Sequence, residues 1–189
     1  RPQSSSRYET FNASGIDIML VMDTSTSMEA IDPSSNLTRI ENAKIRANEF
    51  ILKRISDRIG IVVFSAIAFT QCPLTLDKDA LVNFVNSIDT KITKTDGTAI
   101  GSAVATAVNR LSKIDSKSKI IILLTDGANN SGEIDPLAAA QIAKDNDIKI
   151  YTVGVGGLDD YYEIEDMFFG KRKVNPRKTD LDENLLKEI

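Results

Sequence analysis

Short apolar runs alternate along this chain with longer segments whose apolar residues recur at helical spacing. A nearly continuous apolar run is typical of a strand that is buried on both faces of a parallel sheet. The predicted strands are residues 16–22, 58–65, 119–125 and 148–155. The predicted amphipathic helices are residues 37–51, 77–88, 100–111 and 136–146, the last with Asp135 as its N-cap and Pro136 at its first position. This alternation predicts an α/β fold with a mostly parallel central sheet, helices on both faces and right-handed crossovers.

Other segments complete this outline. Residues 68–75 alternate in polarity and contain Pro73, which predicts an edge strand in an antiparallel hairpin with 58–65. Residues 159–169 predict a further helix that packs the aromatic side chains of Tyr161, Tyr162, Phe168 and Phe169, and residues 180–189 predict a last helix. A fold of this class normally adds a closing strand after such a helix, and we expect that strand to be missing from this chain.

The length of 189 residues predicts one domain. Residues 1–14 are polar and aperiodic and are interpreted as an N-terminal tail, which leaves 15–189 as the single domain. A net charge of −4 argues against a nucleic-acid partner. A short basic group is expected to be a solvated loop: Lys171, Arg172, Lys173, Arg177 and Lys178. No apolar run approaches the roughly 20 residues that span a bilayer.

Histidine is absent and Cys72 is the only cysteine. Without imidazole the chain cannot build a Ser-His-Asp or Cys-His nucleophile or a His-ligated zinc site. A single cysteine excludes an internal disulfide, and Cys72 is interpreted as a small residue near a strand edge. These absences leave oxygen atoms as the chemistry available to a binding site.

Oxygen-bearing side chains follow the predicted strands, where open α/β sheets bind their ligands. Asp23 ends the first strand and is followed by Ser25 and Ser27, Asp126 follows the strand 119–125, and Thr98 lies in the segment DGT. Residues two apart in an extended or turning segment point the same way, so both serine hydroxyls can face one ion. Two carboxylates with neutral hydroxyls suit Mg²⁺ or Mn²⁺ better than Ca²⁺ and leave the ion enough charge to attract an external carboxylate.

The segment DTSTS, with the Thr of DGTAIG and the Asp of LLTDG, resembles the metal-ion-dependent adhesion site (MIDAS) of von Willebrand factor A (vWA) domains. RIGIVVFS, AFTQCPLT, IILLTDGANNSGEIDP and IYTVGVG are similar to the bacterial Bat (Bacteroides aerotolerance) proteins, particularly BatA. The resemblance implies a Rossmann-like, doubly wound three-layer sandwich with one antiparallel edge strand. It also implies hydroxyl ligation by Ser25, Ser27 and Thr98, with Asp23 and Asp126 acting directly or through water. Thr26 stands where the family often has glycine.

The same resemblance implies a non-enzymatic, cation-dependent module that binds a partner protein through an Asp or Glu carboxylate. Mg²⁺ is the expected ion, with Mn²⁺ or Ca²⁺ as alternatives. The resemblance places the domain in the periplasm, as part of an inner-membrane protein anchored by segments outside this chain. Other Bat proteins or a MoxR-type ATPase are the implied partners.

Two alternatives stay open. One is a Mg²⁺-dependent phosphoryl-transfer or hydrolytic enzyme, since haloacid-dehalogenase-type phosphatases also end their first strand with Asp; they need a second Asp at the position of Ser25, however. The other is an assembly subunit in which the cation site regulates the position of the helix 180–189.

Overall fold

The computed structural model describes residues 15–90, 92, 95–127, 129–157, 159–166, 170–174 and 182–189. The predicted tail, residues 1–14, lies outside these ranges. Five strands form the central sheet in the order β5-β4-β1-β6-β7. They are β1 (Asp17–Asp23), β4 (Arg58–Phe64), β5 (Ala68–Thr75), β6 (Lys119–Thr125) and β7 (Ile148–Gly154). All neighbours pair in parallel except β4 and β5, which confirms the mostly parallel sheet with an antiparallel edge strand.

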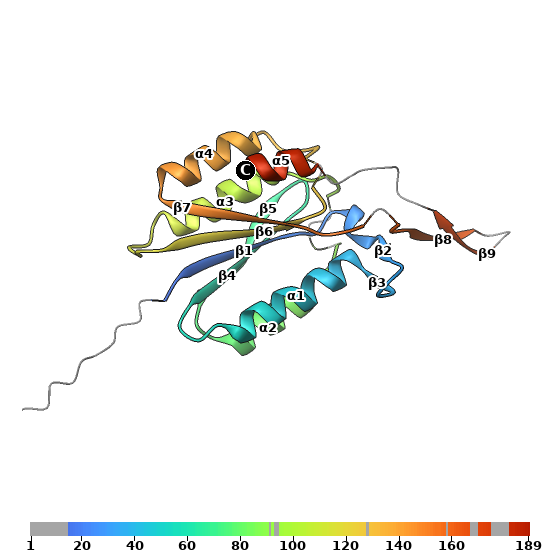
Figure 1. Ribbon diagram of the computed structural model, residues 1–189, viewed down its shortest axis with the longest axis horizontal. Helices are drawn as coiled ribbons and strands as arrows, with labels where there is room; N and C mark the ends of the chain where they lie inside the picture. The colour runs from blue at the N-terminus through green and yellow to red at the C-terminus, as the bar shows by residue number, and fades with distance from the viewer. Residues whose placement is uncertain are drawn as a thin grey trace, which may run out of the picture.

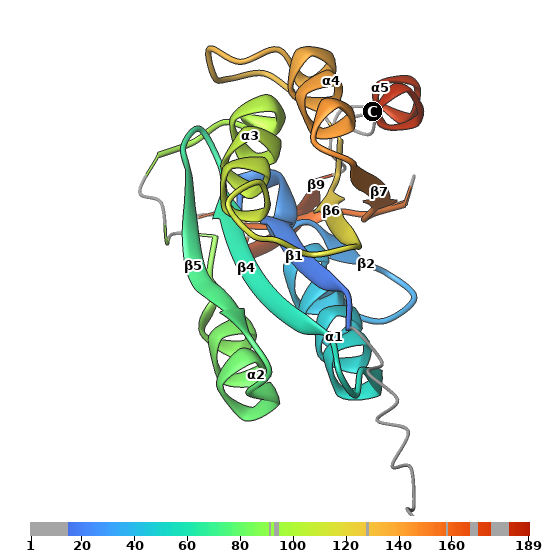
Figure 2. The same ribbon diagram turned by 90° about the vertical axis from the view of Figure 1, so that its left-hand side faces the viewer.

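Helices cover both faces of this sheet, as predicted (Figures 1 and 2). One face carries α1 (Arg39–Lys53) and α2 (Lys78–Ser87). The other face carries α3 (Ile100–Leu111), α4 (Pro136–Asp145) and α5 (Glu183–Glu188). Short elements lie between β1 and α1: η1 (Thr26–Glu29), β2 (Ile31–Asp32) and β3 (Leu37–Thr38).

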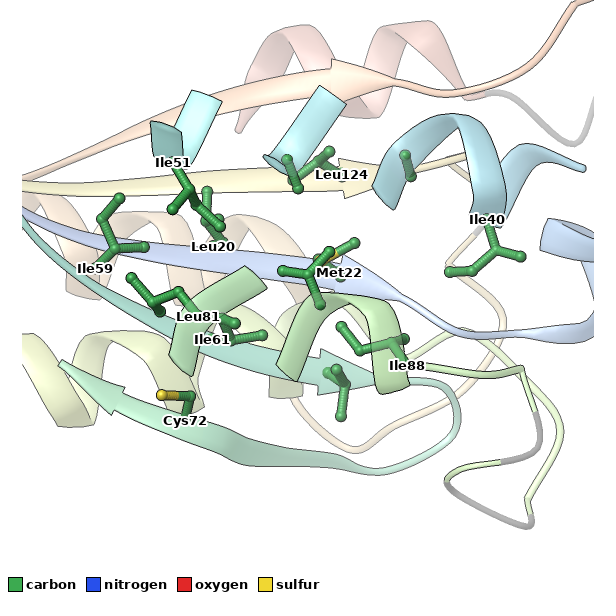
Figure 3. Packing of buried hydrophobic residues seen from close by; sticks show 14 of the residues in the cluster. Leu20, Met22, Ile40, Ile51, Ile59, Ile61, Cys72, Leu81, Ile88 and Leu124 are labelled. Atoms are coloured by element: carbon green, nitrogen blue, oxygen red, sulfur yellow. The ribbon is translucent and has the colours of Figure 1, made fainter. Parts of the chain in front are cut away.

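The core divides into two hydrophobic clusters because successive side chains of β1 point to opposite faces of the sheet. Leu20 and Met22 pack with residues of α1 and α2 in the first cluster, part of which Figure 3 shows. Met19 and Val21 pack with α3 and α4 in the second. Cys72 is buried in the first cluster, and this burial raises the pKa of its thiol, as expected for an inert cysteine.

Side-chain caps mark the starts of α1, α2 and α4. Thr38 forms a capping box with Glu41 at the start of α1, and Asp77 caps α2. Asp135 caps α4 with Pro136 in its first turn, as predicted. These caps are local, so the sequence predicted the helix starts well.

The prediction of a helix over 159–169 is wrong. Residues 162–166 form β8 (Tyr162–Asp166), which pairs in antiparallel fashion with β9 (Gly170–Val174). The pairing places Glu163 opposite Lys173, and opposite charges across a strand pair stabilise a hairpin. Phe168 and Phe169 lie outside the described residues.

The predicted basic loop is corrected by the same hairpin. Residues 171–173 belong to β9 and are paired with residues of β8 instead of forming a loop. Arg177 and Lys178 lie outside the described residues. The hairpin projects from the same end of the molecule as β2 and β3 (Figure 1).

Candidate metal centre

The carboxyl ends of β1 and β6 bring two acidic residues to one edge of the sheet. Asp23 is the last residue of β1, and Asp126 directly follows β6. Because the two strands are parallel neighbours, with Met22 opposite Leu124, their ends lie side by side. Asp23 and Asp126 are both buried, with exposed fractions of 0% and 1%.

Three hydrogen bonds hold the Asp23 carboxylate. Its Oδ1 accepts from the Ser25 backbone N–H at 2.9 Å and from the Ser25 hydroxyl at 2.6 Å. Its Oδ2 accepts from the Thr125 hydroxyl at 2.5 Å. Asp23 is therefore fixed from its own loop and from the neighbouring strand.

The two predicted serine ligands lie next to each other. Ser25 Oγ and Ser27 Oγ are 2.9 Å apart, as expected for hydroxyls that face one position. Ser25 is the N-cap residue of η1, and this short helix turns the chain back so that Ser27 stays near the strand end. Thr26, in place of the family's frequent glycine, is accommodated at negative φ.

Thr98 reaches the same region from the segment before α3. It is buried, and its backbone N–H donates to Asn130 Oδ1 at 2.8 Å. Its loop is tied to η1 because the Thr26 hydroxyl donates to Asp96 Oδ1 at 2.9 Å. That hydrogen bond also lowers the pKa of Asp96. Segments from three parts of the chain thus meet around the sheet edge.

Burial and the nearby Asp126 raise the pKa of Asp23 from 3.8 to about 7, although its hydrogen bonds act in the opposite direction. Two buried like charges side by side are unfavourable unless a cation lies close to both. The arrangement fits a divalent cation held by Asp23, Asp126 and the neighbouring hydroxyls. In the described part of the chain, no group of three or more acidic or cysteine side chains lies close enough together to hold a metal ion. A cation at this site would therefore need serine and threonine hydroxyls among its ligands.

Sequence reasoning missed Arg39, which contacts Asp126, and Asp160, which contacts Arg39. The Arg39 guanidinium donates to Asp126 Oδ2 at 2.9 Å and to Asp160 Oδ2 at 2.7 Å. Arg39 precedes Ala43 by four positions, so helical spacing already places it on the buried face of α1. No local pattern could have identified Asp160, because it reaches Arg39 across 121 residues of sequence.

The chain is similar to known proteins over nearly its whole length. The von Willebrand factor type A domain family model matches residues 17–189. A Borreliella burgdorferi protein described as uncharacterized is 30% identical over 177 residues, which cover 94% of this chain and 51% of that protein. The chain therefore spans about half the length of the curated relatives it matches.

Two solved structures of similar proteins come from Bacteroides. An aerotolerance-related membrane protein of Bacteroides fragilis aligns with a TM-score of 0.74 and 29% identity, over 92% of this chain and 86% of that one. BatB of Bacteroides thetaiotaomicron aligns with a TM-score of 0.74 and 27% identity, over 92% and 84% of the two chains. Among the described residues of the present chain, none of the helices has the length and apolar content needed to cross a bilayer.

A more distant structure shares the fold and was solved with a metal. Proximal thread matrix protein 1 of the mussel byssus is described as having a zinc-occupied MIDAS motif. It aligns with a TM-score of 0.62 and 23% identity, over 74% of this chain and 38% of that one.

Proposed function

Because this chain belongs to the von Willebrand factor type A domain family, we propose that it is a cation-dependent protein-binding module. In this proposal the hydroxyls of Ser25, Ser27 and Thr98 hold a divalent cation, and the carboxylates of Asp23 and Asp126 bind it directly or through water. The cation then accepts an Asp or Glu carboxylate from a partner. The observation that carries the proposal is the buried pair of Asp23 and Asp126, whose mutual repulsion a cation would relieve.

We propose Mg²⁺ as the ion, with Mn²⁺ or Ca²⁺ as alternatives. Hydroxyl and carboxylate oxygens are hard ligands, and a compact set of them suits a small octahedral cation. With only two carboxylates the ion keeps positive charge, which favours attraction of a partner's carboxylate. The Ser25 hydroxyl donates to Asp23 where a phosphatase of the alternative class would need a second Asp, so binding is favoured over catalysis.

We propose that this chain is a periplasmic domain of a longer inner-membrane protein. The Bacteroides fragilis relative is described as an aerotolerance-related membrane protein, and the chain spans about half of its curated relatives. Other Bat proteins or a MoxR-type ATPase are the proposed partners. Protease treatment of intact spheroplasts tests the location: the domain should be cleaved, and protection would contradict a periplasmic position.

Cation binding is tested first by calorimetric titration of the purified domain with Mg²⁺ and Mn²⁺. Asp23→Asn should lower the affinity at least about tenfold, because one of two anionic groups is lost. The variant should be at least as stable as the wild type without cation, since the like-charge repulsion is removed. Asp79→Ala, an exposed acid at the start of α2, is the control and should bind normally. Unchanged affinity in Asp23→Asn would contradict the site.

Partner binding is tested by capture from solubilised membranes of the native organism. Wild-type protein should retain a specific partner in Mg²⁺ and release it in excess EDTA while staying folded by circular dichroism. Asp23→Asn should retain none in either condition. A partner that survives EDTA and the substitution would show that binding does not use the cation.

A further inference from the structure

Arg39 lies between two buried carboxylates at the first turn of α1. Its Nη1 is 2.9 Å from Asp126 Oδ2, and its Nε is 2.7 Å from Asp160 Oδ2. The exposed fraction of Arg39 is 7%, and those of Asp126 and Asp160 are 1% each. Burial disfavours the charged guanidinium, but its contacts with Asp160 and Asp126 outweigh that effect and raise its pKa. Arg39 is therefore a buried cation next to a proposed ligand.

Asp160 is held in place by the chain that leads into β8. Its Oδ2 also accepts the backbone N–H of Gly157 at 2.9 Å. Tyr161, the next residue, exchanges two backbone hydrogen bonds with Ile31. Gly156 has a φ of +124°, and a Cβ there would lie 2.6 Å from Arg39 Nε, so only glycine lets this turn lie against the guanidinium. These backbone contacts therefore hold the Arg39–Asp160 ion pair in a fixed position in the fold.

Among the residues that the structure describes, the buried charges around the site do not cancel. Asp23, Asp126 and Asp160 contribute three negative charges when ionised, and Arg39 contributes one positive charge. The set therefore carries a charge of −2, the amount that one divalent cation neutralises. Uncompensated buried charge is costly, so the number of charges around the site affects how strongly it attracts a cation.

We propose that Arg39 and Asp160 set the charge of the cation site, with Arg39 weakening and Asp160 strengthening its attraction for a divalent cation. This inference rests on the proposed function. Arg39 occupies one oxygen of Asp126 and so reduces the negative charge that Asp126 presents to the ion. A bound cation then keeps more positive charge for the carboxylate of a partner. Asp160 positions Arg39 and offsets part of its charge.

The test is a charge cycle measured as Mn²⁺ affinity by calorimetric titration at pH 8. Arg39→Gln should bind Mn²⁺ about tenfold more tightly than the wild type, because a nearby positive charge is gone. Asp160→Asn should bind it at least about threefold more weakly, because a negative charge is gone. The double variant should return to within about threefold of the wild type, because the charge of −2 is restored.

The opposite pattern would overturn the inference. If the ion pair served only to hold Asp126 in position, both single variants would bind Mn²⁺ more weakly and the double variant would not recover. Arg39→Lys keeps the charge but loses the forked guanidinium, so it should stay within about threefold of the wild type. A large loss in Arg39→Lys would point to geometry and contradict a role for charge. If Arg39→Gln does not fold, Arg39→Lys still decides between the two roles, because Asp160→Asn is expected to weaken Mn²⁺ binding under both.

A second arginine–aspartate ion pair, far from the site and with a more exposed arginine, supplies the control. Arg58 Nε and Nη2 donate to the two oxygens of Asp17 at 2.6 Å each, and this pair joins the N-terminal ends of β1 and β4, at the other end of β1 from Asp23. Arg58→Gln should lower the free energy of unfolding but leave Mn²⁺ affinity unchanged. A gain in affinity like that of Arg39→Gln would mean that the effect is not specific to the site.

A second readout follows the partner's chemistry. With Mn²⁺ saturating, acetate should bind the Arg39→Gln protein more weakly than the wild type, measured by water proton relaxation; tighter acetate binding would contradict the inference.

Failure of the proposed function and failure of this inference give different results. A wild-type domain that binds no Mn²⁺ contradicts the proposed function and this inference with it. A wild type that binds Mn²⁺, with single variants that shift in the same direction, contradicts the inference alone.

Discussion

At the scale of single residues, Asp23 combines full burial with a second acid beside it. Hydrogen bonds from Ser25 and Thr125 stabilise its charge, yet burial and Asp126 outweigh them and raise its pKa to about 7. A carboxylate that resists ionisation costs the folded protein stability once it is forced to ionise. A cation would reverse this effect, which links binding, pH and stability at one side chain.

This linkage predicts how the cation-free domain responds to pH. Between the ordinary value of 3.8 and about 7, folded Asp23 holds a proton that the unfolded chain has released. The free energy of unfolding should therefore fall as pH rises from about 5 to about 8, by at most about 1.4 kcal/mol per pH unit. Urea denaturation at several pH values measures it.

Two controls isolate the contribution of Asp23. Asp23→Asn and saturating Mg²⁺ should each remove most of the decline between pH 5 and pH 8. Asp32, Glu41 and Asp96 have lowered pKa values, so they lose their stabilising charge only at more acidic pH, outside this window. An equal decline in Asp23→Asn would assign the effect to another group.

At the scale of elements, α3 depends on a close approach that its sequence alone does not display. Gly101 is buried in the first turn of α3, against the segment that leads into α4. A Cβ at this position would lie 1.9 Å from the backbone oxygen of Ile134. Helix propensity would favour alanine here, but packing requires glycine.

Gly101→Ala should therefore destabilise the domain by about 2–3 kcal/mol, because α3 and residues 134–135 must separate. From propensity alone the same change would stabilise the helix by up to about 1 kcal/mol. The midpoint of denaturant unfolding distinguishes the two signs. Asn109→Ala, at an exposed position of the same helix, is the control and should change stability by about 0.5 kcal/mol or less. A stabilised Gly101→Ala protein would mean that the two segments are not in close contact.

At the scale of the whole molecule, the domain is a sheet with hydrophobic clusters on both faces. β1 lies in the middle of the sheet and contributes to both clusters, Leu20 to one and Met19 to the other. The proposed metal ligand Asp23 therefore ends a strand in which every residue is buried. A buried central strand is suited to hold cation-binding side chains in fixed positions.

Both clusters should matter for stability. Leu20→Ala and Met19→Ala should each lower the free energy of unfolding by about 2–5 kcal/mol, because each leaves a cavity in a closed core. Leu52→Ala is the matched control: Leu52 lies on α1 but is 59% exposed, and its loss should cost about 0.5 kcal/mol or less. If Met19→Ala were as mild as Leu52→Ala, the face covered by α3 and α4 would not be a core.

The sequence by itself determined most helices and strands of the central sheet, because the burial pattern of a strand and the amphipathic pattern of a helix depend on residues that are close in sequence. Residues 119–125 form a buried strand and Asp135 caps α4, as their local patterns predicted. The order Asp23, Ser25, Ser27 also indicated the local part of the candidate site: the Ser25 hydroxyl donates to Asp23 and lies next to the Ser27 hydroxyl. The prediction of a helix over 159–169 was wrong because residues 162–166 form β8, which pairs with β9. Helical periodicity carries no information about such a pairing partner.

Only the tertiary structure decided the electrostatics of the site. The raised pKa of Asp23 requires Asp126 beside it, and Arg39 reaches Asp126 and Asp160 across 87 and 121 residues of sequence. Charges interact through space with a strength set by distance and burial, and neither quantity can be read from the order of residues. The chain's sequence therefore indicated which oxygen atoms could hold a cation, and the fold decided the net charge that surrounds it.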